Sequence, residues 1–216
     1  MNIDTRIIAL VILVFGIVSF GTYMWMSPSA TTTTITTPTA RQDVELSPEV
    51  EDVLTKETRT IEELAKDPLI ISEVIASNEK DGALSGGDIA RLDGEWQKSK
   101  EVTPFIQQFL SNKTAEILLA FQKINPGFKE VFVTNVYGLN VGQTDKTSDY
   151  YQADEAWWQD SFNGGAGKTL HGQIEFDESS QTEAISLYVP IIDPVSSKVI
   201  GVLKGVLDLV VIKRQL

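Results

Sequence analysis

The sequence predicts an α+β domain, in which a run of helices is followed by a five-stranded antiparallel sheet. Between residues 44 and 127 the apolar residues recur at helical spacing, and Asn125-Pro126-Gly127 ends this helical part. From residue 128 to 212 the apolar period changes to two, which is typical of strands. Helices that precede the strands, rather than alternating with them, favour an α+β fold over a doubly wound one.

Capping residues indicate where the helices of residues 44–127 begin. Ser47, Asp67 and Thr103 each stand directly before a proline, the combination expected at the N-cap and the first helical position. We also expect Asp88 to cap a helix after a Ser-Gly-Gly break, and Ser111 to cap the last helix of this part. Because these helices carry an apolar side, we expect them to cover one face of the sheet.

Five strands are predicted, at residues 128–135, 139–144, 169–176, 183–192 and 198–210. Short turns join the last three, so we expect them to form a meander. The strand at 183–192 alternates apolar residues with small or polar ones, which predicts one buried face. Its apolar face holds Ile185, Leu187, Val189 and Ile191, and its other face holds Ala184, Ser186 and Tyr188.

The first 43 residues predict a membrane anchor and a linker. Residues 7–26 carry no charge and, at about 1.5 Å per residue, can cross the roughly 30 Å hydrocarbon core of a bilayer. Arg6 precedes this segment and the next cation is Arg41, so residues 1–6 are expected in the cytoplasm and the domain outside it. Residues 27–43 form a Thr/Pro-rich linker. A cleaved signal peptide is the alternative, although its apolar stretch usually has only about 7–15 residues.

The composition excludes several classes of function. The 216 residues include no cysteine and one histidine, which excludes thiolate nucleophiles and multi-histidine metal sites. A net charge of −12 disfavours nucleic acid as a partner. Residues 162–169 differ from a P-loop because they precede a strand instead of following one, and the acids of residues 145–155 lack calcium-loop spacing. We therefore expect no catalytic residues, no metal and no cofactor.

Four segments of the sheet part together resemble one family of sensor domains. They are EVFVTNVYGLNVGQT (130–144), SDYYQADEAWWQDSF (148–162), GQIEFDESSQTEAISLYVPIID (172–193) and KVIGVLKGVLDLV (198–210). In this order they are similar to the Cache family, or PDC sensors, which are extracytoplasmic ligand-sensing domains. The resemblance implies a PAS-like sheet behind a long N-terminal helix, in a single-module form. It also implies a small ligand between the sheet and the loops that cover its other face.

The chain departs from this family where amino-acid-binding relatives have an arginine for the ligand carboxylate. The corresponding stretch reads EAWW (155–158), so Glu155 replaces the cation, while Asp177 matches the acid that holds the ligand ammonium. A carboxylate ligand would be repelled by these two acids unless Lys168, Lys204 or a metal compensated. The departure favours a cationic or neutral ligand.

Eight residues form the candidate ligand-binding site. They are Tyr150, Tyr151, Glu155, Trp157, Trp158, Asp177, Ser186 and Tyr188. The aromatic members are expected to form a wall over the sheet that can enclose a cation. As alternatives, Trp157 and Phe162 could simply pin a short helix to the core, and Asp177 could cap a turn. Ser186 and Tyr188 could equally face solvent.

We expect a membrane-anchored, single-pass sensor whose extracytoplasmic domain binds a small molecule without catalysis. Because the sequence ends a few residues after the last predicted strand, passing a signal on is expected to need a partner protein. A structural or adhesive cell-envelope domain of the same fold is the alternative, and a hydrolase that uses carboxylate pairs is a weaker one. The sequence leaves the ligand, the signalling partner, the oligomeric state and the host organism open.

Overall fold

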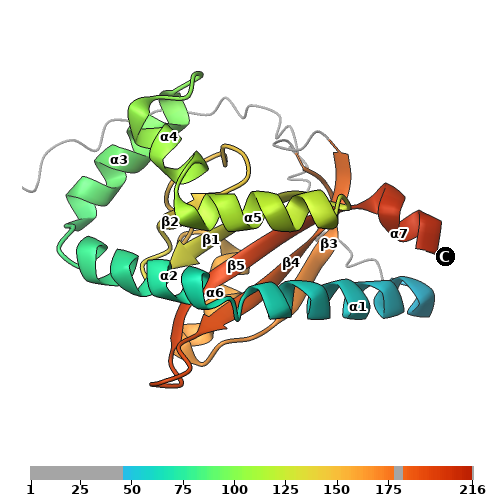
Figure 1. Cartoon of the computed structure of the whole chain (residues 1–216). Helices are drawn as coiled ribbons and strands as arrows, with labels where there is room; N and C mark the ends of the chain where they lie inside the picture. Colours follow the sequence, from blue (N-terminus) through green and yellow to red (C-terminus); the bar gives the residue numbers. More distant parts are fainter. Residues whose placement is uncertain (1–45, 178–181, 216) are drawn as a thin grey trace, which may run out of the picture. The chain divides into compact units, whose positions relative to one another are not determined.

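The computed structural model describes residues 46–177 and 182–215. The predicted cytoplasmic segment, membrane helix and linker (1–6, 7–26 and 27–43) lie outside these residues. Among the described helices, none combines the length and the apolar character that a membrane crossing requires. The described chain has helices before strands, as the α+β prediction requires (Figure 1).

Five helices come first: α1 (Pro48–Leu64), α2 (Pro68–Asp81), α3 (Gly86–Lys98), α4 (Pro104–Leu110) and α5 (Lys113–Ile124). Three of the predicted N-caps are confirmed. The side chains of Ser47, Asp67 and Thr103 accept hydrogen bonds from backbone N–H groups in the first turns of α1, α2 and α4. These bonds satisfy donors that have no partner inside the helix, which fixes where each helix begins.

The other two predicted N-caps are wrong by one to three residues. Ser85 caps α3, and Asp88 is the reciprocal member of a capping box, with its carboxylate accepting from the Ser85 backbone. Asn112, not Ser111, caps α5 and accepts a hydrogen bond from the Ala115 N–H group. In both places two suitable capping residues stand close together, and the backbone conformation decides which one acts as the cap.

The sheet has five antiparallel strands: β1 (Phe128–Asn135), β2 (Asn140–Gln143), β3 (Leu170–Asp177), β4 (Thr182–Ile192) and β5 (Val199–Asp208). Their order is β2-β1-β5-β4-β3, so the last three strands form the predicted meander and β5 is central. Between β2 and β3 the chain forms α6 (Ala156–Phe162) and a short 3-10 turn (Asn163–Gly165). After β5 it turns at once into α7 (Leu209–Gln215), where the last strand was predicted to continue.

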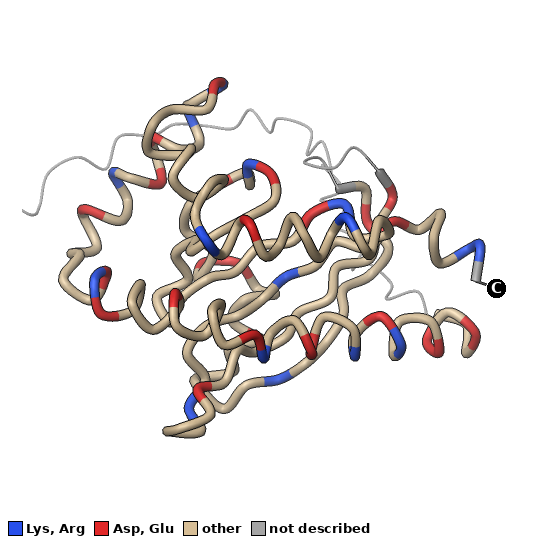
Figure 2. Tube along the Cα trace, viewed as in Figure 1, with Lys and Arg blue, Asp and Glu red and all other residues tan. Residues whose placement is uncertain are grey.

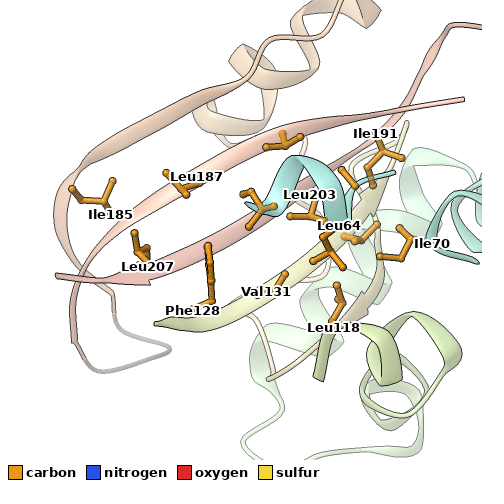
Figure 3. Close-up of a cluster of buried hydrophobic side chains, with 14 of the residues drawn as sticks. Leu64, Ile70, Leu118, Phe128, Val131, Ile185, Leu187, Ile191, Leu203 and Leu207 are labelled. Atoms are coloured by element: carbon orange, nitrogen blue, oxygen red, sulfur yellow. The ribbon is translucent and has the colours of Figure 1, made fainter. Parts of the chain in front are cut away.

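Helices α1, α2 and α5 cover one side of the sheet, which we call the helix face (Figure 1). The main hydrophobic core lies between them and the strands (Figure 3). The apolar set predicted on strand 183–192 is in this core: Ile185, Leu187, Val189 and Ile191. The helical part therefore covers one face of the sheet, as expected from its apolar side.

Two glycines of β5 allow close packing on this face. A Cβ on Gly201 would lie 2.1 Å from the Thr134 carbonyl oxygen of β1, which is too short for a side chain, and 3.2 Å from Val74 of α2. A Cβ on Gly205 would lie 3.0 Å from the Phe128 ring, which is a tight contact, so both positions serve packing in the core. Lys204 stands between them with the opposite parity, so its side chain projects from the other side of the sheet.

Helices α3 and α4 build a second, smaller core. It buries Trp96, Ile106, Phe109, Leu139 and Tyr150. The Trp96 indole donates a hydrogen bond of 2.9 Å to the Thr147 carbonyl oxygen, in the loop that follows β2. This small core therefore holds the loop of residues 144–155, which leads into α6.

Candidate ligand-binding site

The side of the sheet opposite the helices, which we call the open face, carries a row of three side chains across its central strands. Lys204 of β5 is the register partner of Phe132 on β1 and of Tyr188 on β4. Because directly paired residues of antiparallel strands project from the same face, these three side chains lie next to one another. β5 carries two charged residues in all, Lys204 and Asp208, and Figure 2 shows how few charges the strands carry compared with the helices.

Helix α6 lies over the open face and is attached to it by Trp158. The indole N–H of Trp158 donates a hydrogen bond of 2.9 Å to the Thr134 hydroxyl, and its ring stacks on Phe162 with centroids 4.6 Å apart. Trp158 is buried. A buried indole needs such a polar partner, so this contact fixes the position of the helix.

The neighbouring Trp157 points toward the row of three. Its ring is stacked on Tyr188, with a centroid distance of 5.0 Å and an interplanar angle of 14°, and it meets the Phe132 ring edge-on at 5.9 Å. Trp157 is only half-buried, in contrast to Trp158. One side of its ring is therefore available to a molecule from solvent.

A pocket of about 230 Å³ lies between α6, the preceding loop and the open face. It is lined by Ser148, Gln152, Glu155, Trp157, Glu175, Phe176, Ala184, Ser186, Tyr188 and Lys204. Three of the ten lining residues are aromatic, and six are polar or charged. The rings can supply contact area to a small molecule, and the polar groups can fix its orientation.

The ammonium group of Lys204 lies among three aromatic rings. Its Nζ atom is 5.1 Å from the centroid of Trp157, 5.5 Å from that of Phe132 and 6.0 Å from that of Tyr188. At these distances each ring attracts the cation. Among the described residues, no carboxylate forms an ion pair with Lys204, although Asp208 on the same strand pairs with Lys129.

The loop that carries part of the lining is tied to α3 by Asp93. The Oδ1 atom of Asp93 accepts hydrogen bonds from the backbone N–H groups of Tyr150 and Tyr151, at 2.9 and 3.0 Å. The two donating residues stand between Ser148 and Gln152, which line the pocket. The aromatic dipeptide of the loop therefore serves to hold it on α3.

One carboxyl group of this loop has a strongly shifted pKa. Burial raises the pKa of Asp149 to about 6, and the nearby charges of Asp93, Glu155 and Asp154 add to this effect. The Gln152 side chain opposes it by donating a hydrogen bond to the Asp149 carboxylate. The charge of the loop between β2 and α6 therefore changes in the pH range just below neutrality.

Two polar side chains of β2 also belong to the open face. Gln143 is fully buried, and neither its amide oxygen nor its amide nitrogen has a hydrogen-bond partner among the described residues. It is the register partner of Phe132, which places it in the same cross-strand row as Lys204. Asn140 is also buried and leaves its Oδ1 atom unpaired, while its Nδ2 atom donates to Thr147 and Asp149.

The structure divides the eight candidate residues between several places. Those that line the pocket are Glu155, Trp157, Ser186 and Tyr188. Tyr150 is buried in the small core and Tyr151 packs against it, while Trp158 anchors α6. Asp177 is the last residue of β3, and its side chain lies outside what the structure describes. Of the five aromatic candidates, Trp157 and Tyr188 line the pocket, and Phe176 is the third ring of the lining.

Six residues of the lining are not among the eight candidates: Ser148, Gln152, Glu175, Phe176, Ala184 and Lys204. Of these, the sequence indicates Lys204 only as a possible compensating charge. Phe132 and Gln143, which lie in the same cross-strand row as Lys204, are not candidates either. A sequence signal existed for Lys204, since a single lysine interrupts an otherwise apolar strand. Its contact with rings from β1, β4 and α6 depends on strand register, which the sequence does not reveal.

A larger hollow of about 530 Å³ lies elsewhere, beside α7 and the turn between α5 and β1. Its lining includes the exposed side chains of Ile124 and Val210 and the ion pair of Lys129 with Asp208. Glu57 and Arg214 also line it, and its one aromatic side chain is Phe128, so it lacks the group of rings found in the smaller pocket. Among the described residues, no group of His, Asp and Glu side chains is arranged to hold a metal ion.

Comparisons with known proteins gave matches only among solved structures. No family model matches the chain, and no curated protein does. The ligand-binding domain of the Pseudomonas aeruginosa PAO1 amino acid chemoreceptor PctB, in complex with L-Arg, is 15% identical with a TM-score of 0.41. The match covers 77% of this chain and 54% of that domain.

Two further solved structures are also sensory domains. The ligand-binding domain of the Campylobacter jejuni chemoreceptor Tlp3, in complex with 4-methylisoleucine, is 15% identical with a TM-score of 0.39, over 78% of this chain and 64% of that one. The sensor domain of DcuS from E. coli is 20% identical with a TM-score of 0.34, over 60% of this chain and 92% of that one.

Proposed function

We propose that this chain is a Cache-type sensor domain that binds a small molecule in the open-face pocket and performs no catalysis. In this proposal residues 7–26 hold the protein in the cell membrane, and residues 44–212 form the extracytoplasmic domain. The single observation that carries the proposal is the pocket of about 230 Å³ between α6 and the sheet, with the half-buried Trp157 as its roof. The four segments that resemble Cache domains agree with it.

The placement of the pocket supports a sensing role because its walls belong to different parts of the fold. Trp157 comes from α6, Glu155 from the loop tied to α3, and Lys204 from the central strand β5. A ligand that contacts all three will favour the arrangement of α6 and sheet that it fits best. Since β5 leads directly into α7, a change at the pocket can be passed along the last strand to the end of the domain.

A thermal-shift screen of the full-length chain tests this proposal. The panel should contain amines, carboxylates, amino acids and purines, each at several concentrations. A ligand that binds only the folded state raises Tm in proportion to the logarithm of its concentration. We expect one chemical class to raise Tm, and we expect Trp157→Ala to abolish the rise. The matched control is Tyr137→Ala, which truncates a partly exposed ring outside the pocket.

The same screen can decide for the alternative function. If the whole panel leaves Tm unchanged, the ligand-binding proposal is contradicted and a structural cell-envelope domain is favoured. If a compound raises Tm equally in the chain and in Trp157→Ala, binding occurs elsewhere and the assignment of this pocket is contradicted.

A further inference from the structure

The charge that the pocket presents to a ligand differs from the one that the sequence suggests. Glu155 stands where an arginine would contact a carboxylate, which favours a cationic or neutral ligand. The structure adds Lys204, a lining residue whose ammonium lies within 6.0 Å of the ring centroids of Trp157, Phe132 and Tyr188. The position of this lysine decides whether an anionic or a cationic group of a ligand can lie beside the rings.

Lys204 lacks a counter-ion among the described residues, in a chain where 30 acids outnumber 18 bases. Within the described part of the chain its ammonium contacts the three rings, and the acid of its own strand, Asp208, has its Oδ2 atom 3.4 Å from the Nζ atom of Lys129. Aromatic rings attract an ammonium but accept none of its N–H donors as well as an anion does. The donors of Lys204 are thus free for a ligand.

We propose that Lys204 binds an anionic group of the ligand, so that the pocket takes small molecules carrying a carboxylate or a similar anion. This inference rests on the proposed function and names the chemical class that the pocket accepts. The ring contacts orient Lys204 before a ligand arrives, which lowers the entropy cost of forming the pair. The rings also shield the pair from water, so that it is stronger than an ion pair on the surface.

A cationic group of a ligand cannot compete with Lys204 for contact with these rings. The ammonium of Lys204 already occupies the space that a bound cation would need, and its tether keeps it there at a high effective concentration. A cationic group in that position would also meet the like charge of Lys204 at short range. The ring cluster of Trp157, Phe132 and Tyr188 is therefore a support for the lysine rather than an empty cation site.

The two carboxylates of the lining set the orientation of the ligand. Glu155 and Glu175 are exposed, so solvent screens their charge, whereas Lys204 is half-buried between rings. The anionic end of a ligand is favoured at Lys204, with its neutral or cationic part toward the two acids. Gln143, in the same cross-strand row, adds unpaired buried polarity to this part of the face. A purely apolar ligand would offer neither Lys204 nor Gln143 a polar contact.

Three molecules of one shape and different charge test the proposal: benzoate (−1), benzamide (0) and benzamidine (+1). Their binding to the full-length chain is measured by calorimetry and by thermal shift, together with any carboxylate that the broad screen identifies. We expect benzoate to bind at least tenfold more tightly than benzamide, and benzamidine to bind more weakly than either. A preference of this size is what one charge-assisted hydrogen bond supplies.

Two substitutions at Lys204 and one matched control assign the effect to this residue. Lys204→Met keeps the length of the side chain and removes its charge, and should weaken benzoate binding at least tenfold. Lys204→Arg keeps the charge and should retain binding within a few-fold. Lys123→Met, on the exposed end of α5, makes the same change in net charge outside the pocket and should have no effect.

Each contrary outcome contradicts a different statement. If benzamidine binds best, and better still to Lys204→Met, the pocket is a cation site and the anion proposal is overturned while ligand binding stands. If Lys204→Met binds benzoate as well as the unchanged chain does, Lys204 is not the recognition group. If neither the series nor the broad panel binds, the proposed function fails along with this inference.

Discussion

The two faces of the sheet are filled in different ways, although the same strands form both. On the helix face, Leu203 of β5 is fully buried in the continuous apolar core that lies beneath the helices. On the open face, its neighbour Lys204 is half-buried among rings beside a pocket. Alternate residues of one strand thus serve stability and recognition separately. A substitution on one face should therefore leave the property of the other largely intact.

The largest expected effect is on the helix face. Leu203→Ala should lower the free energy of unfolding by about 2–5 kcal/mol, because it removes a fully buried side chain and leaves a cavity. Lys204→Met, one residue further on, should change it by less than about 1 kcal/mol. Urea denaturation of both variants measures the difference. Equal losses in the two variants would show that the faces are not energetically distinct.

The two tryptophans of α6 should separate in the same way. Trp158→Phe removes the hydrogen bond to Thr134 and should destabilise the domain by about 1–2 kcal/mol. Trp157→Phe should have a smaller effect on unfolding, since Trp157 is half-buried and has no such bond among the described contacts. Ligand binding should be weakened more by Trp157→Phe than by Trp158→Phe. If Trp157→Phe loses more stability than Trp158→Phe does, Trp158 is not the residue that anchors α6.

An unpaired group on the open face offers a gain in stability. Replacing Gln143 by methionine should raise the free energy of unfolding of the ligand-free domain by about 1 kcal/mol, because a buried amide without partners is costly. The control is Gln143→Glu, which keeps the shape and should destabilise by placing a charge there. If Gln143→Met is destabilising too, the Gln143 amide has a hydrogen-bond partner in solution, and its burial carries no cost in stability.

The smallest expected effect concerns pH. Burial raises the pKa of Asp149 to about 6 in the folded domain, above the ordinary value of 3.8. Between these values the folded state binds more protons than the unfolded state, so the free energy of unfolding should fall as pH rises from about 4 to about 6. Since Asp149 is only partly buried, we expect a change below about 1 kcal/mol.

A neighbouring acid provides the control for the pH effect. Asp149→Asn should flatten this pH dependence, and Asp154→Asn, an exposed carboxylate of the same loop, should leave most of it. Tm measured from pH 4 to pH 7 decides between them. If the slope of Tm against pH is the same in Asp149→Asn as in the unchanged chain, another group is responsible for the pH dependence.

The sequence predicted the parts of the fold that depend on local pattern. The alternation in β4 correctly placed Ile185 in the core, and the turn at Asn125-Pro126-Gly127 correctly separated helices from sheet. It could not assign the aromatic pairs of residues 150–151 and 157–158. Neighbouring residues in a loop or a short helix point in different directions, and only the packing of α3 and α6 decides which rings are buried.

The ring contacts of Lys204 were equally beyond local pattern. They join residues from β1, α6 and β4 that are far apart in the sequence, so they follow from strand pairing and from the packing of α6 on the sheet. The sequence indicated a compensating charge only as one of several possibilities. The position of Lys204 among the three rings is thus a property of the assembled fold.

Fluorine NMR of the chain labelled with 5-fluorotryptophan tests the central claim most directly, because one spectrum reports on both faces of α6 and on the small core. The resonance of Trp157 is identified by its absence in Trp157→Phe. With a compound that raises Tm, the Trp157 resonance should move with concentration, while that of Trp96, buried in the small core, should stay fixed. A stabilising compound that leaves Trp157 unmoved would contradict a ligand site between α6 and the open face.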